Sequence, residues 1–161
     1  MILYISMIIL GFVMMEFVAW SNHKYIMHGF LWRWHKDHHT RDREKVTLKE
    51  LGKTEANRFE KNDLFFVLYA FPAILLMITG LSFNKLTLVF FSIGITLYGA
   101  VYFLIHDVVI HRRLPLPCLQ NSSNKYLQAV IKAHLAHHRP KSRRDFYNYG
   151  LLIFPSKFFN D

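Results

Sequence analysis

Residues 1–28, MILYISMIILGFVMMEFVAWSNHKYIMH, place a long apolar run directly before two histidines. The run from Met1 to Trp20 is nearly all apolar and is broken by Ser6 and Glu16. A helix that crosses a bilayer needs about 20 such residues, and backbone groups in lipid are satisfied only in helices or closed barrels. We therefore expect a membrane-spanning helix that ends where the histidines begin.

Two further apolar blocks, from Leu64 to Leu81 and from Leu86 to Ile105, contain no charged residue. The composition agrees with this pattern, because hydrophobic residues make up 52% and aromatic residues 16% of the 161 residues. A soluble domain of this size has difficulty covering so much apolar surface, and a disordered chain needs low hydrophobicity. The sequence therefore predicts an all-α integral membrane bundle of three spans, and we expect residues 1–161 to form a single domain.

Three further segments need a separate assignment: the C-terminal segment, the first apolar block, and the stretch that ends in the last histidine triplet. Phe146 to Phe159 is too short, and too interrupted by Pro155 and Lys157, to span, so we expect it to lie at the interface or to re-enter the membrane. The first apolar block has the length of a signal peptide. No basic stretch precedes it and no clear small-residue cleavage site follows it, which favours an uncleaved helix. In the second half of the chain, residues 124–138 are expected to form a helix with Asn124 as N-cap and Pro140 as its stop.

Basic residues flank the spans and predict their orientation. They lie between the first and second blocks and after the third, whereas the turn between the second and third holds only Lys85. By the positive-inside rule both basic segments are cytoplasmic and the N-terminus is outside. Membrane orientation thus accounts for the net charge of +9, and nucleic-acid binding is disfavoured because no nucleic-acid motif is present.

All ten histidines fall into four clusters that repeat one pattern twice, an HxxxxH pair followed by an HxxHH triplet. The members are His23 and His28; His35, His38 and His39; His106 and His111; and His134, His137 and His138. Residues i, i+3 and i+4 share a helix face, so each triplet can converge on one point. Residues five apart diverge by about 140° on an ideal helix. Either the helix is distorted there, as in a π-type bulge, or the two members of a pair bind different metals.

Ten imidazoles on one predicted membrane face indicate a metal centre. Imidazole suits iron, copper, nickel and zinc, whereas calcium and magnesium prefer oxygen. The zinc motif HExxH is absent, and the single cysteine excludes Cys-based zinc or iron–sulfur sites. Ten ligands are too many for one centre and suit two, so two redox-active irons with four or five histidines each is the economical interpretation. Histidines without a function at the membrane interface, or haem ligands, would not occur as four clusters that include histidines adjacent in the sequence.

The four histidine boxes, their order and the three spans resemble the fatty-acid hydroxylase superfamily of membrane non-haem di-iron enzymes. Nearly the whole chain takes part in the resemblance, and local runs are similar to the bacterial β-carotene 3-hydroxylase family. These runs are EFVAW (16–20), HKYIMHG (23–29), HKDHH (35–39) and HDVVIHRR (106–113). The resemblance implies that the ten histidines are the ligands of two irons.

The resemblance further implies O₂-dependent hydroxylation of β-ionone rings at carbon 3, which converts β-carotene through β-cryptoxanthin to zeaxanthin. Electrons would come from NAD(P)H through a ferredoxin. A hydrocarbon ring offers no acid–base handle, so the metal supplies the chemistry and the protein orients the substrate and excludes water. On the cytoplasmic side of a bacterial inner membrane, the basic loop with Arg41, Arg43 and Lys45 would attract an acidic ferredoxin.

Three acidic residues are candidates for orienting the metal ligands. Glu16 lies within a predicted span, where an ionisable group is a functional candidate. It shares a helix face with His23 and could hydrogen-bond that imidazole, or it could be a protonated or paired carboxyl near the outer leaflet. Asp37 and Asp107 each adjoin a histidine and could act in the same way, while Asp107 could instead pair with a neighbouring arginine. No catalytic residue is expected beyond the metal centre.

Two alternatives remain open at this point. One keeps the di-iron centre and changes the substrate to a sterol, a fatty acyl chain or another carotenoid, as in a hydroxylase or ketolase. The other is a membrane metal transporter. Transport sites usually lie near the bilayer midplane on broken helices, whereas these histidines lie at one edge and the spans hold no matching polar residue except Glu16.

Overall fold

The structure is a computed structural model that describes residues 1–44, 59–140 and 146–160. All regular elements in these ranges are helices, which confirms the all-α fold class. In chain order they are α1 (Ile2–Ser21), the π-helix η1 (Asn22–Phe30), α2 (Trp32–Glu44), the 3₁₀-helix η2 (Lys61–Leu64), α3 (Phe65–Ser82), α4 (Leu86–Phe103), the π-helix η3 (Leu104–Ile110), α5 (Pro117–Gln120), α6 (Lys125–His138) and the 3₁₀-helix η4 (Ser156–Phe159).

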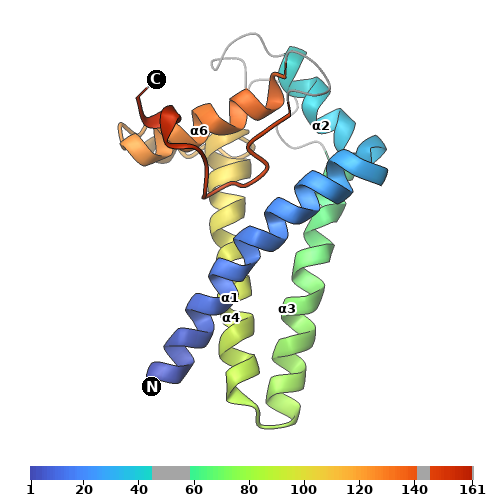
Figure 1. Cartoon of the computed structure of the whole chain (residues 1–161), viewed down its shortest axis with the longest axis vertical. Coiled ribbons are helices and arrows are strands. Elements are labelled where there is room, and N and C mark those ends of the chain that lie inside the picture. Colours follow the sequence, from blue (N-terminus) through green and yellow to red (C-terminus); the bar gives the residue numbers. More distant parts are fainter. Residues whose placement is uncertain (45–58, 141–145, 161) are drawn as a thin grey trace.

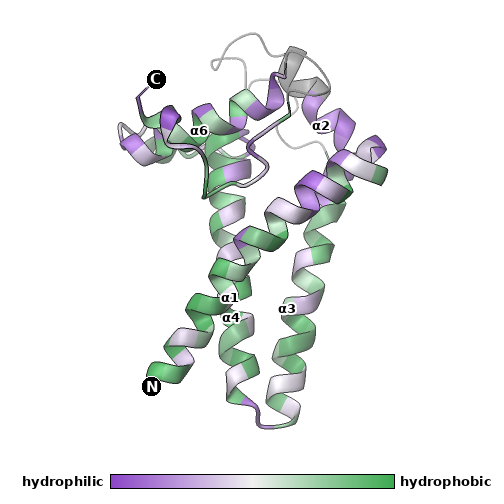
Figure 2. Ribbon diagram, in the orientation of Figure 1, coloured by the Kyte–Doolittle hydropathy of each residue, from purple (hydrophilic) through white to green (hydrophobic). Residues whose placement is uncertain are grey.

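Three continuous helical segments are long and apolar enough to cross a membrane, which confirms the three predicted spans. They are Ile2–Phe30, Lys61–Ser82 and Leu86–Ile110. Their surfaces expose large apolar side chains such as Phe71 and Leu97, which soluble monomers rarely gather into wide patches. Figure 2 shows these apolar residues along the long helices and polar residues at the end that holds α2 and α6.

Helix α1 packs across α4. Helix α4 follows α3 after a tight turn, and the two helices run antiparallel (Figure 1). Glycine allows the α1 and α4 backbones to touch. A Cβ atom at Gly11 would collide with the carbonyl oxygen of Phe91, and one at Gly94 with the carbonyl oxygen of Ile8. Small residues permit this kind of close helix approach in membranes. As a result, α1 and α4 both lead to the end of the molecule where α2 and α6 lie (Figure 1).

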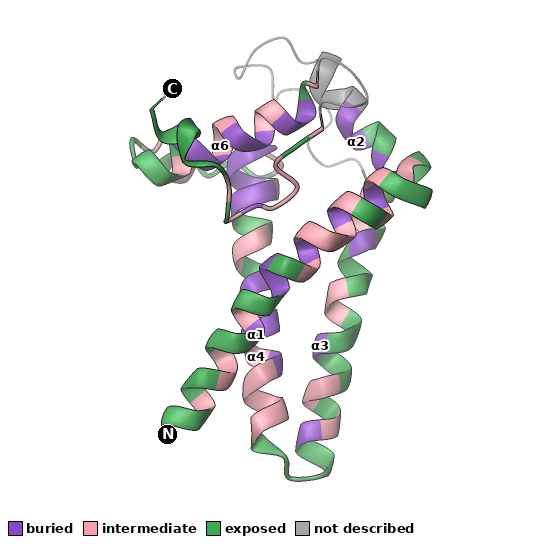
Figure 3. Ribbon diagram, in the orientation of Figure 1, coloured by how far each residue is buried: buried purple, intermediate pink, exposed green. Residues whose placement is uncertain are grey.

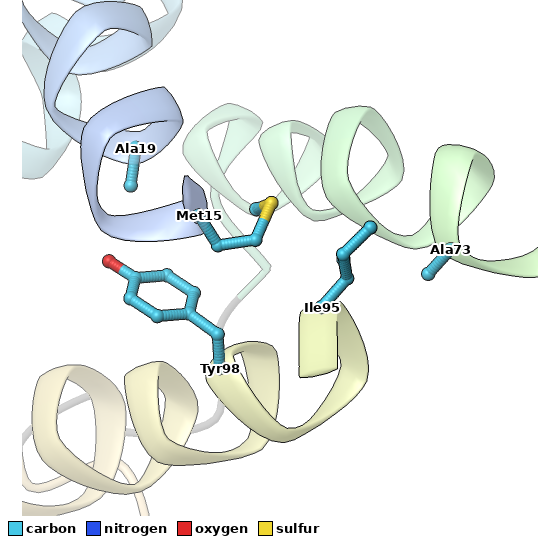
Figure 4. Close-up of a cluster of buried hydrophobic side chains, with 5 residues drawn as sticks. All are labelled: Met15, Ala19, Ala73, Ile95 and Tyr98. Atoms are coloured by element: carbon cyan, nitrogen blue, oxygen red, sulfur yellow. The ribbon is translucent and has the colours of Figure 1, made fainter. Parts of the chain in front are cut away.

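The apolar core between the spans is small. It consists of Met15 and Ala19 from α1, Ala73 from α3, and Ile95 and Tyr98 from α4 (Figure 4). Buried residues are concentrated towards the polar end of the bundle (Figure 3). There the buried side chains include nine of the ten histidines, and His28 is half-buried. The most enclosed part of the protein is therefore a polar cluster at one end of three apolar helices.

The second half of the chain folds over this cluster. The side chain of Asn124 accepts hydrogen bonds from the backbone N–H groups of Tyr126 and Leu127, and α6 ends at His138, which confirms the predicted cap and the predicted end of the helix. Residues 146–155 form no helix, and only η4 follows them. This agrees with the prediction that the C-terminal segment does not span. It instead packs against α1 and α6 through contacts described below.

Candidate metal centre

The pair His23 and His28 lies on the π-helix η1, and His106 lies on the π-helix η3, which His111 directly follows as its C-cap. In a π-helix the backbone hydrogen bonds join residues five apart, and the N–H of His111 donates to the carbonyl of His106 at 2.9 Å. Residues five apart are therefore neighbours here, although they would diverge on an ideal α-helix. Of the two predicted possibilities the structure shows the distorted helix, because both members of each pair contribute to the same group of nitrogens.

Histidine nitrogens gather in two groups, and the ligand atoms of each group all lie within 4.8 Å of one another. The first group is His23, His28, His35, His39 and His137, and the second is His38, His106, His111 and His134. Helices α2 and α6 each supply histidines to both groups. The spacing of each HxxHH triplet would allow it to converge on one point, but in the structure each triplet is divided between the two groups. Residues three apart, such as His134 and His137, differ by about 60° around a helix and about 4.5 Å along it. This difference is enough for their side chains to enter two neighbouring groups.

His138 belongs to neither group and contacts both. Its ring centroid lies 4.3 Å from that of His39 in the first group and 4.5 Å from that of His134 in the second. The residue is fully enclosed, with 0% of its surface exposed. The tenth histidine thus lies between the two groups, and its assignment as a ligand stays a prediction.

The outer nitrogens of three histidines in the first group hydrogen-bond to oxygen acceptors. Nδ1 of His23 donates to the carbonyl of Tyr149 at 2.8 Å, Nδ1 of His35 to the amide oxygen of Asn62 at 2.7 Å, and Nδ1 of His137 to the carbonyl of Tyr147 at 2.6 Å. Partners of this kind fix the ring orientation and the tautomer of metal-binding histidines. Two of the three partners belong to the C-terminal segment and one to η2.

These outer hydrogen bonds determine which nitrogen faces the group. A carbonyl oxygen can only accept, so Nδ1 carries the hydrogen and Nε2 of the neutral ring presents a lone pair. The Nε2 atoms of His23 and His35 are 3.1 Å apart, so two lone pairs face each other with no hydrogen between them. If two imidazoles bound one ion through bonds of about 2.1 Å that met at about 90° at the ion, their two binding nitrogens would lie about 3 Å apart. The donor set therefore fits a metal ion.

Burial lowers the pKa of histidines in both groups and so favours their neutral form. It lowers the pKa of His35 from 6.5 to about 3, although the hydrogen bond with Asn62 opposes the change. It lowers the pKa of His137 to about 4 against the hydrogen bond with Tyr147. Burial and the surrounding imidazoles also hold the pKa of His38 and His134 well below the usual value. Neutral imidazole is the form that binds metals.

Carboxylates orient two histidines of the second group. Nδ1 of His38 lies 3.2 Å from a carboxylate oxygen of Glu60, and Nδ1 of His106 lies 3.2 Å from one of Asp107. The sequence left open whether Asp107 orients an imidazole or pairs with an arginine, and the structure shows both contacts. Arg113 donates to Asp107 at 2.9 Å.

Arg113 ties the second group to the segment that precedes α3. Its two terminal nitrogens donate to the two carboxylate oxygens of Asp63, each at 2.7 Å. Paired hydrogen bonds of this kind are strong and directional. They raise the pKa of Arg113 above its usual value, although partial burial opposes the rise. The guanidinium thus connects η2 to η3 beside His106.

Sequence reasoning missed the segment from Glu60 to Asp63. Its polar residues serve both groups, because Asn62 contacts His35 and Glu60 contacts His38. Asp63 in turn accepts a hydrogen bond from the backbone N–H of Glu60 at 2.9 Å, which closes a capping box at the start of η2. The available signal was a polar run, EKND (60–63), directly before an apolar block and on the predicted face of the histidines.

The other two acidic candidates lie elsewhere. Glu16 accepts hydrogen bonds from Tyr98 and from the backbone of residues 151–153, and in the described part of the chain no histidine bonds to it. The predicted direct hydrogen bond to His23 is therefore absent, because the outer nitrogen of His23 is bound to Tyr149. Asp37 is exposed on α2, and its role stays a prediction.

The fold and the site define a helical protein with three apolar helices and two histidine groups suited to metal ions. The sequence profile described as fatty acid hydroxylase matches residues 8–160, and the chain belongs to the fatty acid hydroxylase family. This confirms the predicted resemblance and the predicted class of enzyme.

Several relatives of known name are similar over most of the chain. A β-carotene hydroxylase of Pseudescherichia vulneris is 37% identical over 90% of this chain and 73% of its own length. One of Pantoea ananas is 34% identical over 88% of this chain and 71% of its own length. The chloroplastic β-carotene hydroxylase 2 of Capsicum annuum is 34% identical over 89% of this chain and 42% of its own length. No solved structure gives a significant match.

The ion pairs of Arg113 generate a prediction for the second group. Arg113→Gln removes the charge that holds Asp107 beside His106 and ties η3 to Asp63. We expect metal affinity at the second group to fall about 10- to 100-fold, as for other losses of outer contacts to metal ligands. Metal titration of the purified protein in detergent, followed by elemental analysis, measures this loss.

The matched control is Arg112→Gln, which makes the same change of charge one residue away. We expect it to keep the metal content of the unaltered protein. Equal metal affinity in the two variants would show that the Arg113 network does not support the second group.

Proposed function

We propose that this protein is a β-carotene 3-hydroxylase that uses O₂ to hydroxylate β-ionone rings through two non-haem irons. The observation that carries the proposal is the pair of inward-facing imidazole groups at one end of three apolar helices. Relatives named β-carotene hydroxylase support the choice of substrate. We further propose that the spans and the histidine cluster form one domain over residues 1–161.

The five histidines of the first group would hold one iron and the four of the second group the other, with His138 available between them. Bound iron would supply the redox chemistry by which O₂ oxidises an unactivated C–H bond. For each ring, one oxygen atom of O₂ enters the C–H bond to give an alcohol. The other leaves as water, and two electrons and two protons are consumed.

The chain itself would orient the ligands and exclude water. Neutral, Nδ1-protonated imidazoles such as His35 and His137 present Nε2 to the metal without first losing a proton. The carbonyls and carboxylates behind the rings prevent them from turning away. Because His137 and His138 are 0% exposed, bulk water does not reach this side of the site. The apolar helices end at the cluster (Figure 2), so a carotenoid ring could approach it from the bilayer.

The histidine end would face the cytoplasm of a bacterial inner membrane and receive electrons from NAD(P)H through a ferredoxin. The positive-inside rule supports this orientation. Arg33 and Lys36 are exposed on α2 at that end of the molecule. The side chains of Arg41 and Arg43 and the whole of Lys45, to which we assign the attraction of an acidic ferredoxin, lie outside the described residues.

Pigment analysis tests the reaction. In β-carotene-producing bacterial cells the unaltered protein should yield zeaxanthin with some β-cryptoxanthin. His137→Ala removes a ligand of the first group and should abolish both products. Lys125→Ala, which changes an exposed residue on the same helix α6, should leave them unchanged. Chromatography of the extracted pigments gives the result.

Other outcomes point to the alternatives. If β-carotene stays unaltered while sterols, fatty acyl chains or other carotenoids acquire oxygen, the di-iron chemistry stands and the proposed substrate is wrong. If the protein carries exchangeable zinc across vesicles without O₂-dependent turnover, it is a metal transporter, and the proposed reaction is refuted.

The electron donor has a separate test. Replacing Arg41, Arg43 and Lys45 with glutamine should slow reduction by an acidic ferredoxin by about tenfold at low salt, because the positive patch raises the encounter rate. The difference should disappear at high salt, where charges are screened. Lys85→Gln, at the turn between α3 and α4 on the opposite end (Figure 1), is the control. Stopped-flow reduction rates that are equal at low salt would rule out this role for the basic loop.

A further inference from the structure

Glu16 is a buried acidic residue in the apolar helix α1, only 6% exposed. Its Oε1 atom accepts hydrogen bonds from the backbone N–H groups of Leu151, Leu152 and Ile153 at 3.0, 2.9 and 2.9 Å. Its Oε2 atom accepts one from the hydroxyl of Tyr98 at 2.6 Å. Within the described residues no lysine or arginine pairs with it. Four neutral donors therefore take the place of a cation.

The C-terminal segment is shaped around this carboxylate. Three successive N–H groups that converge on one oxygen form a concave anion site of the kind called a nest. A Cβ atom at Gly150 would lie 2.8 Å from the Oε1 atom of Glu16 and 2.8 Å from the carbonyl oxygen of Ile153. Only glycine fits at position 150 without displacement of the backbone or the carboxylate. The segment is thus attached to α1 by a specific contact.

The residues directly before this attachment contact the metal ligands. The carbonyl of Tyr149 accepts from Nδ1 of His23, and the carbonyl of Tyr147 accepts from Nδ1 of His137. Both histidines belong to the first group, one from η1 and the other from α6. The outer partners in the second group, Glu60 and Asp107, come from other segments. The hydrogen bonds of the segment attached at Glu16 therefore lead to ligands of the first group.

We propose that Glu16 is a positioning residue for the first histidine group. By holding the backbone of residues 151–153 it fixes the carbonyls of Tyr147 and Tyr149, which set the tautomer and direction of His137 and His23. The role rests on the proposed metal centre but goes beyond it, since the hydrogen bonds of Glu16 in the described residues go to Tyr98 and the backbone of residues 151–153 and not to a histidine. It also explains why a carboxylate lies in an apolar helix, about 10 Å along the axis from His23.

The first test uses the metal-free protein in detergent. Hydrogen exchange should show that the amides of Leu151, Leu152 and Ile153 are protected in the unaltered chain and lose protection in Glu16→Leu. Glu16→Gln keeps an acceptor at Oε1 and should retain most of the protection. Tyr98→Phe removes only the donor to Oε2 and should retain it as well. Unchanged protection in Glu16→Leu overturns the proposal, whether or not the protein binds iron.

The second test counts bound metal. Cobalt(II) titration, followed by its visible absorption, should give two equivalents for the unaltered protein and Glu16→Gln. It should give one for Glu16→Leu and for Gly150→Ala, since affinity at the first group falls about 10- to 100-fold. Adding Glu16→Leu to His137→Ala should cause little further loss. Adding it to His134→Ala, which disables the second group, should remove the remaining metal.

The outcomes distinguish a failure of the metal centre from a failure of the positioning role of Glu16. If the unaltered protein binds no pair of cobalt ions, the proposed metal centre fails, while the exchange experiment still decides whether Glu16 holds the segment. If Glu16→Leu keeps two equivalents, the positioning role is refuted and the metal centre stands. If Glu16→Leu loses both ions together with its helical circular dichroism, Glu16 supports the whole fold and the specific role is also refuted.

Discussion

Imidazole lone pairs that point at one another inside the protein are the constraint on which the rest of the structure depends. The Nε2 atoms of His23 and His35 lie 3.1 Å apart, and those of His111 and His134 lie 3.2 Å apart. Where the outer nitrogen donates to a carbonyl, no hydrogen lies between two such atoms, so their partial charges repel. A cation at the centre would turn this repulsion into attraction. In the structure, the fold itself holds the rings in place.

Several segments that are far apart in the described part of the chain hold the rings in place. The π-helices bring residues five apart to the same side, and α2 and α6 each divide their histidines between the two groups. Behind the rings, η2 supplies Asn62 and Glu60, while the C-terminal segment supplies two backbone carbonyls. The spans thus do more than anchor the site, because each has at one end residues that belong to a histidine group or hydrogen-bond to one. If one of these supporting segments became mobile, the histidines that it hydrogen-bonds to would lose their fixed orientation.

The sequence predicted what depends on local pattern. Apolar blocks marked the spans, the ten histidines marked the centre, and Asn124 marked the start of α6. The division of each HxxHH triplet was not predictable, because it depends on where neighbouring helices lie. Backbone carbonyls such as that of Tyr149 carry no side-chain signal at all. Glu16 was recognised as unusual, but its partner Leu151 is 135 residues away in the chain, so the contact could not be inferred from spacing.

Anomalous diffraction at the iron absorption edge, from crystals of the iron-loaded protein, tests whether each of the two histidine groups holds one iron. We expect two peaks, one among His23, His28, His35, His39 and His137 and the other among His38, His106, His111 and His134. Each HxxHH triplet would then contribute ligands to both peaks. A single peak, or two peaks that are each surrounded by one intact triplet, would refute the division of the histidines into these two groups.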